Sequence, residues 1–429
     1  MQQTLLSGLL SMVLTILLPL QTTAQIQLLG VGTIPGDATD LSGLKGNQTD
    51  GTPHNRLGGM GSAIGYTGQG NHYVLASDRG PKDGATDFAC RYHRMEIVVT
   101  PGAANPVALK LTATHLLKNE QGQQFVGTLS AIDARYPEKS LRLDPEGIRV
   151  GPQGTLFLAD EYGPFVREFS VEGKCLRRLP VPDRFLSAVA GGKPDEELPP
   201  KNTRGRQPNR GMEGLAISPD GKKLFGLMQS PLIQDGGLSP DNKRVGINNR
   251  LLEINLADGK TREFIYQLDD QANGVSEILA VNDHTFLVLE RDSRGGLDAQ
   301  CKKLFLIDLE GADDVSKVDS LPAGKLPAGL NAVTKRLFLD MLDPVYQLKG
   351  ADFPEKIEGL AFGPPFADGR QLLIVTADND FVATAPFRVY AFAIDPTALP
   401  GYQPQRFDHP ANSPLSPGGR GAGGEGERR

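Results

Sequence analysis

The sequence is short of cysteine and of excess positive charge, and both shortages narrow what the protein can be. Three cysteines in 429 residues are too few for a disulfide scaffold, and their odd number favours free buried thiols. The formal net charge is −6, and no basic stripe suited to nucleic acid runs along the chain. We therefore expect no DNA or RNA partner.

Several familiar catalytic motifs are also missing. No serine lies in a Gly-x-Ser-x-Gly elbow, so the nucleophile of an α/β-hydrolase is not indicated. None of the six histidines belongs to a His-Glu-x-x-His pattern, which makes transition-metal catalysis a poor fit. The chemistry that remains is that of carboxylate oxygens and arginines.

One apolar run, from Leu5 to Leu20, precedes the small residues that end at Ala24. The run is too short for a comfortable membrane span, and a secretory signal ends in this way. The residues before it lack Lys and Arg, which leaves an uncleaved anchor as the alternative. We predict a signal peptide over 1–24 and a secreted or periplasmic protein, monomeric and free of the membrane once the signal is removed.

A carboxylate, a short apolar strand, a turn and a second apolar strand ending in acids form a unit that recurs along the chain. The unit is clearest at Asp144–Val150, where Gly151-Pro152-Gln153-Gly154 supplies the turn before Thr155–Gly163. Further copies begin near Met212, Ser276 and Ile357, and a weaker first copy carries Ser62 in place of glutamate.

Repeated all-strand units at intervals of about 60–85 residues are typical of a propeller. We predict an all-β propeller over residues 25–400, followed by a disordered low-complexity tail over 401–429. Five copies are visible and the connectors leave room for another, so we expect six blades. The unpartnered strand Ile26–Ile34 is expected to close the ring by pairing with Arg388–Ile394.

Acidic residues recur where the first strand of each blade begins and where the second strand ends. If the first strands line a central channel, carboxylates from several blades meet at one rim, where like charges and burial oppose ionisation. Calcium, which takes six to eight oxygen ligands, is the expected neutraliser; the alternative is that each glutamate only caps backbone N–H groups. The predicted calcium ligands are Glu146, Glu213, Glu277, Glu358, Asp78 and Asp378.

Basic residues lie near the same strand ends. Guanidinium groups bind phosphate or carboxylate through paired hydrogen bonds, although each arginine could equally pair with an adjacent acid. The predicted substrate-binding residues are Arg79, Arg210, Arg291 and Lys302.

These motifs resemble the phytase-like family, secreted proteins described as having esterase-like activity of phytase. The resemblance runs from about residue 28 to 396 and is carried by Ala76–Gly80, Asp144–Gly147, Asn209–Leu215, Leu289–Asp292 and Lys356–Leu360. It implies a propeller and a calcium-assisted hydrolase of phosphate or other small-molecule esters. For that chemistry we predict Glu213, Asp160 and Glu161 as catalytic residues.

Two other functions stay open at this point. One is a propeller lactonase or carboxylic-ester hydrolase that uses one calcium ion in the channel. The other is a non-catalytic extracellular binding protein whose calcium is structural.

Overall fold

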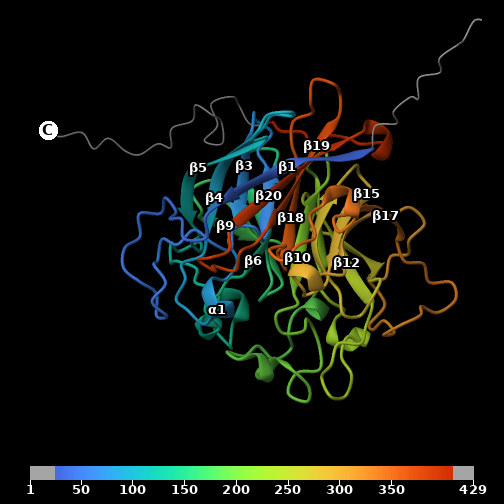
Figure 1. Ribbon diagram of the computed structural model, residues 1–429. Coiled ribbons are helices and arrows are strands. Elements are labelled where there is room, and N and C mark those ends of the chain that lie inside the picture. Colours follow the sequence, from blue (N-terminus) through green and yellow to red (C-terminus); the bar gives the residue numbers. More distant parts are fainter. Residues whose placement is uncertain (1–24, 409–429) are drawn as a thin grey trace, which may run out of the picture.

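Five four-stranded antiparallel sheets surround a central axis in the computed structural model, which describes residues 25–408 (Figure 1). The first sheet contains β2 (Ala63–Tyr66), β3 (His72–Ala76), β4 (Arg91–Val99) and β5 (Val107–Leu116). The second contains β6 (Pro145–Val150), β7 (Leu156–Asp160), β8 (Phe165–Phe169) and β9 (Cys175–Arg178). The third contains β10 (Met212–Ile217), β11 (Lys223–Met228), β12 (Asn248–Asn255) and β13 (Thr261–Gln267).

The fourth sheet contains β14 (Gly274–Ala280), β15 (Thr285–Arg291), β16 (Lys302–Asp308) and β17 (Thr334–Asp340). The fifth contains β18 (Ile357–Phe362), β19 (Gln371–Ala377), β20 (Phe387–Ile394) and β1 (Ile26–Ile34). The helical segments are short and lie in the connections: α1 (Pro81–Gly84) and the 3₁₀ turns η1 (Leu129–Ala131), η2 (Pro137–Lys139), η3 (Asp183–Phe185), η4 (Pro194–Glu197), η5 (Ile233–Asp235), η6 (Gly296–Asp298), η7 (Pro344–Tyr346) and η8 (Pro396–Ala398).

The hairpin of β6 and β7 shows how the repeated sequence unit forms the inner part of a blade. Every residue of both strands is buried, which suits two apolar runs in the middle of a sheet stack. Gly151 donates its N–H to the Thr155 carbonyl at 2.7 Å, and Gly154 has φ +88°, a left-handed conformation that favours glycine.

The all-β propeller is confirmed, but the described residues form five blades and the expected number of six was wrong. The two connectors that left room for another blade do not contain one. In the second connector, the strand-like segment at Lys335–Asp340 is β17, which pairs with β16 as the outer strand of the fourth blade. The first connector, residues 118–143, makes only isolated bridges such as Val126 with Arg142 and the turns η1 and η2.

The predicted closure by the N-terminal strand is confirmed. β1 pairs antiparallel with β20 from Ile26 opposite Ile394 to Ile34 opposite Phe387, so the first and last strands share one blade (Figure 1). Gly32 lies so close to the first blade that a Cβ atom there would be 2.7 Å from Cγ1 of Val107. Joining the two ends of the chain in one sheet therefore also seals the contact between the fifth and first blades.

The apolar core is divided into layers, each packed between two neighbouring blades. Val74 of the first blade, for example, shares a cluster with Ile148 and Leu158 of the second. Equivalent clusters lie between the second and third, third and fourth, fourth and fifth, and fifth and first blades. The blades therefore hold one another through their faces, which leaves the polar strand ends free at the axis.

The segment that follows the fifth blade is ordered against the propeller up to residue 408, contrary to the tail predicted from 401. Three backbone N–H groups of this segment donate to carbonyls of the fourth, third and second blades: Gln403 to Val281, Arg406 to Pro219 and Asp408 to Pro152. The rest of the predicted tail and the predicted signal peptide over 1–24 lie outside the described residues. Within residues 25–408, no helix has both the length and the apolar character needed to cross a membrane.

Candidate functional site

The inner strands β2, β6, β10, β14 and β18 lie beside one another around the axis, each in contact with the next. Their first residues and the neighbouring loops enclose a polar cavity of about 800 Å³. The acidic residues of its lining are Asp78, Asp83, Glu146, Glu161, Glu213, Asp352, Glu355, Glu358, Asp378 and Asp380. The basic ones are Arg79, Arg210, Arg291, Lys356 and Arg388. Acids outnumber bases two to one, so the cavity favours a cation.

A β-bulge at the start of the inner strands supplies the axial glutamates. Pro145 pairs with Asp160 and Gly147 with Ala159, which leaves Glu146 without a partner on β7. The same shift occurs in β10 at Glu213 and in β18 around Glu358. An extra residue in a strand redirects its side chain, and all three carboxylates line the cavity.

The fourth blade corrects the prediction that its axial residue is Glu277. There Val275 pairs with Glu290 and Glu277 with Leu289, so the bulged residue is Ser276, and Glu277 takes the place of the glycine that follows the glutamate in other blades. The sequence contained this signal, because Ser276 stands in the same motif position as Ser62 of the first blade.

Glu277 instead lies deeper along the axis and does not line the cavity. Its carboxylate accepts the N–H of Leu215 at 2.9 Å and is 2.9 Å from the guanidinium of Arg149. Arg149 also donates to the carbonyls of Ile64 and Ile278 at 2.6 and 2.8 Å, so the pair ties four blades together. Burial raises the pKa of Glu277 to about 7.

Two of the three axial glutamates keep a buried carboxylate oxygen that has no hydrogen-bond partner in the described part of the chain. Glu213 accepts from Nε2 of Gln229 at 2.5 Å through one oxygen, and its Oε2 is buried without a hydrogen bond. Glu358 binds Arg291 at 2.6 Å through Oε1, and its Oε2 is likewise unpartnered. Burial, followed by the Glu213 carboxylate, raises the pKa of Glu146 well above its ordinary value.

A second acidic group surrounds the ammonium of Lys356 on the same cavity wall. Its Nζ lies 2.8 Å from Asp380, 3.5 Å from Asp378 and 3.7 Å from Asp78. Burial raises the pKa of Asp78 to about 7 even though Lys356 opposes the shift. The predicted ligands Asp78 and Asp378 therefore line the cavity with the axial glutamates, but a lysine that the sequence analysis missed already compensates part of their charge.

Arg79, predicted to bind substrate, is already engaged by acids. Its guanidinium donates to Asp144 at 2.8 Å, to Glu161 at 3.4 Å and to Asp83 at 3.0 Å. Glu161 lines the cavity, and its other oxygen accepts the N–H of Gly211 at 3.3 Å. Arg79 is therefore placed to fix the acids of this wall.

Two other predicted site residues lie away from the cavity lining. Asp160 accepts hydrogen bonds from Arg167 at 2.6 Å and from the N–H of Tyr162 at 3.1 Å, and both bonds lie within the second blade. Lys302 is fully buried and donates to the carboxylate of Asp292 and to the carbonyl of Arg294. Contacts of this kind are typical of residues that stabilise a fold. In the sequence, Asp160 and Lys302 stand at strand ends just as the cavity residues do, so the sequence alone does not separate the two groups.

Arg210 is the one basic residue of the lining whose guanidinium makes neither a hydrogen bond nor an ion pair within the described chain. Burial and the positive charge of Arg244 lower its pKa to about 10. Arg291, by contrast, donates to Glu358 and to Oγ of Ser276 at 3.0 Å. The cavity thus combines carboxylate oxygens that accept no hydrogen bond with one guanidinium that donates none to the described chain.

Comparison with known proteins gives a family and one curated relative. Residues 55–381 match the family described as phytase-like, esterase-like activity of phytase. An uncharacterized secreted protein of Arthroderma benhamiae is 30% identical over 343 residues, a match that covers 64% of each protein. The chain therefore spans less than two thirds of that relative's length.

Solved structures with similar folds are much more distant. A luciferin-regenerating enzyme is 10% identical with a TM-score of 0.33, covering 88% of this chain and 99% of that one. A calcium-binding protein, regucalcin from Agrobacterium tumefaciens, is 10% identical with a TM-score of 0.35, covering 87% and 96%. Scores this low carry no argument, and the fold assignment rests on the sheet topology.

Proposed function

This chain belongs to the phytase-like family, and from that premise we propose that it is a secreted hydrolase of phosphate or other esters that uses calcium in the polar cavity. One observation carries the proposal. Buried oxygens of Glu213 and Glu358 have neither a hydrogen-bond nor an ion-pair partner in the described chain, and the unpaired guanidinium of Arg210 belongs to the same lining. Unpartnered buried carboxylate oxygens are costly unless a cation binds them.

The axial carboxylates fit calcium in ligand type and in charge. Calcium binds carboxylate oxygens at flexible coordination numbers, and Glu146, Glu213 and Glu358 supply such oxygens from three separate blades. Held by these residues, calcium would offset the charge of the carboxylates and would supply Lewis-acid polarisation to an ester. An ion held by carboxylates of more than one blade would also hold those blades together at the axis.

The cationic side of the cavity suits an anionic ester. Arg210 is free to donate to a phosphate or carboxylate oxygen, whereas Arg79 and Arg291 already hold acids of the wall. A guanidinium that binds two oxygens of one phosphate fixes the orientation of the ester.

Hydrolysis requires a proton acceptor near the bound ester. Water forms a bond to phosphorus as the bond to the ester oxygen breaks, and the proton of the water passes to a carboxylate. We assign this role to Glu161, which Arg79 and the N–H of Gly211 hold at the cavity wall. Glu161 then passes this proton to the departing alkoxide and returns to its ionised form.

The test is turnover of p-nitrophenyl phosphate, p-nitrophenyl acetate and a δ-lactone, each with calcium and with EGTA. We expect calcium-dependent hydrolysis of the phosphate ester, reduced about 10- to 100-fold in kcat/KM by Arg210→Met. The control is Arg204→Met, since Arg204 is exposed and does not line the cavity. Turnover of only the lactone or acetate makes the protein a carboxylic-ester hydrolase, and no turnover at all leaves a binding protein.

A further inference from the structure

A second cavity lies at the opposite end of the axis, where the inner strands end. Its volume is about 640 Å³, and its lining shares no residue with that of the polar cavity. Every inner strand contributes an apolar side chain to it: Ile64, Val150, Ile217, Leu279 and Leu360. Between the two cavities, the buried pair of Arg149 and Glu277 joins four blades, and Arg149 also lines the apolar cavity.

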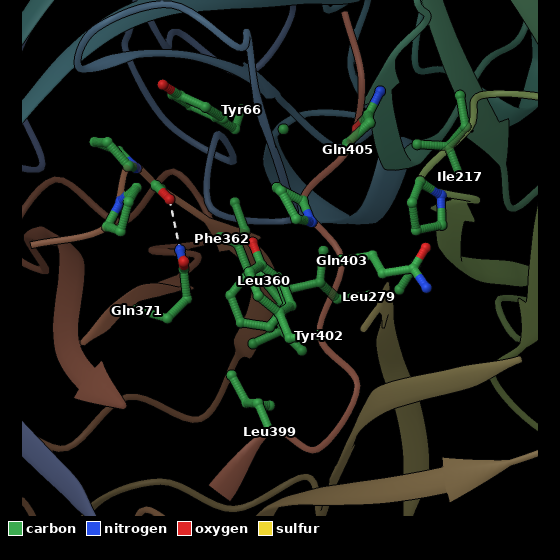
Figure 2. Close-up of a pocket in the computed structure, with 18 of the residues that line it drawn as sticks. Tyr66, Ile217, Leu279, Leu360, Phe362, Gln371, Leu399, Tyr402, Gln403 and Gln405 are labelled. Carbon is green, nitrogen blue, oxygen red and sulfur yellow. Dashed lines mark hydrogen bonds between the residues drawn. The ribbon is translucent and has the colours of Figure 1, made fainter. Parts of the chain in front are cut away.

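The segment after the fifth blade, residues 399–407, forms the other wall of this cavity (Figure 2). The Tyr402 ring packs edge-on against Phe362 with 4.8 Å between ring centres. The backbone N–H groups of Gln403 and Arg406 donate to the fourth and third blades, so the segment crosses the axis from one blade to another. We call residues 399–407 the roof segment.

The polar groups of the lining are mostly occupied within the protein. The Gln371 amide donates to the Gly363 carbonyl at 2.6 Å, the bond dashed in Figure 2. The Gln405 amide donates to the Val150 carbonyl, also at 2.6 Å. The guanidinium of Arg149 is held by Glu277 and by backbone carbonyls. The space that remains is apolar and lacks a free charge to bind an ion.

We propose that this cavity is a binding site for an uncharged, apolar small molecule of aromatic or acyl character. The volume matches that of sites for drug-sized ligands, which are lined mainly by apolar side chains. The roof segment already covers this end and is hydrogen-bonded to three blades, so the cavity is roofed by the chain itself. The sequence beyond 408 contains one large aliphatic side chain, Leu415, and no Phe, Tyr or Trp, so it lacks the residues to fill an apolar space of this size.

The site is independent of the ester chemistry, because the layer of Arg149 and Glu277 lies between the two cavities. Binding here is therefore expected both with calcium and with EGTA. Since the roof segment and all five inner strands contact the same space, an occupant would be enclosed by residues from every blade.

The probe for the test is N-phenyl-1-naphthylamine, an uncharged molecule whose fluorescence rises in apolar surroundings. We expect saturable binding of one molecule per chain, weakened at least about tenfold by Leu279→Trp, which fills the cavity from β14. The matched control is Leu297→Trp, at a loop position that is 69% exposed; its affinity should equal that of the wild type.

A second variant keeps the test valid if the tryptophan at 279 disturbs folding. Tyr402→Ala removes the aromatic ring of the roof segment and should weaken the probe about five- to tenfold through lost apolar contact. Its control is Tyr136→Ala, a tyrosine that is 41% exposed and outside this lining. No saturable binding, or equal binding by all four variants, would overturn the proposal.

Discussion

The two ends of the same five inner strands have opposite chemistry. At the strand beginnings, bulged glutamates leave buried oxygens without partners, and the cavity there is polar and acidic. At the strand ends, the same strands present aliphatic side chains, and the chain's own roof segment covers them. The same repeated unit therefore builds a charged site at the bulged beginnings of the inner strands and an apolar site at their ends, and a buried pair of Arg149 and Glu277 lies between the two sites.

The largest effect is expected from breaking that intervening layer. Arg149→Met removes the cation that faces Glu277 and the donors to carbonyls of two other blades. Removing one partner of a buried pair costs about 3–5 kcal/mol, so urea unfolding should show a loss of this size. Lys201→Met, which breaks an exposed pair with Asp195, should change stability by about 0.5 kcal/mol or less. A loss below about 1 kcal/mol for Arg149→Met would mean that the layer is not structural.

The raised pKa of Glu277, in the same buried layer, should make the free energy of unfolding depend on pH. Its folded pKa of about 7 exceeds the ordinary value of 4.5, so the folded state holds a proton that the unfolded state has released. Stability contributed by this group is complete below about pH 4.5 and is lost as pH rises to about 7, by on the order of 3 kcal/mol in total. The check is the unfolding free energy of wild type minus that of Glu277→Gln across this range. A difference that stays constant with pH would contradict the raised pKa.

The smallest effect is expected at the serine that replaces a glutamate on the fourth blade. Ser276→Ala removes the Oγ that accepts from Nε of Arg291, and the charged donor then lacks one partner. We expect a loss of about 1–2 kcal/mol. Ser187→Ala, which removes a bond to the Val189 carbonyl in an exposed loop, is the control and should lose less than half as much. Equal losses for the two variants would mean that the hydrogen bond from Arg291 to Ser276 stabilises the protein no more than an exposed one.

The sequence predicted the fold through local patterns that the structure keeps. Alternation of apolar strands and glycine turns identified the inner hairpins, and a strand without a neighbour predicted closure by β1. The blade count failed because strand propensity does not tell whether a segment such as Lys335–Asp340 starts a new sheet or completes an old one. That choice depends on pairing with β16 across a long loop, which is a tertiary contact.

For the site, the sequence located Glu146, Glu213 and Glu358 but misplaced their neighbour by one residue. In the fourth blade the bulged residue is Ser276, so Glu277 is one position farther along the strand and lies deeper in the channel. The local sequence around Glu277 resembles that around the axial glutamates and does not reveal this shift. Lys356 and Gln229 were missed because folding alone brings their side chains to these acids: Lys356 lies beside Asp378 of its own blade and Asp78 of the first, and Gln229 donates to Glu213 across the third blade. The apolar cavity was missed for the same reason, since the roof segment comes from a stretch that resembled a disordered tail.

The central claim is that the axial glutamates of the polar end bind calcium. It is tested most directly by the calcium-induced shift in melting temperature of wild type minus the shift of Glu213→Gln. A ligand bound only by the folded state stabilises it by mass action, so we predict a shift on the order of 5 °C for wild type at saturating calcium. The shift should be mostly lost in Glu213→Gln and kept in Glu168→Gln, whose carboxylate binds Arg177 away from the axis. Equal shifts for wild type and Glu213→Gln would contradict the account and leave Glu213 as a structural residue of the channel.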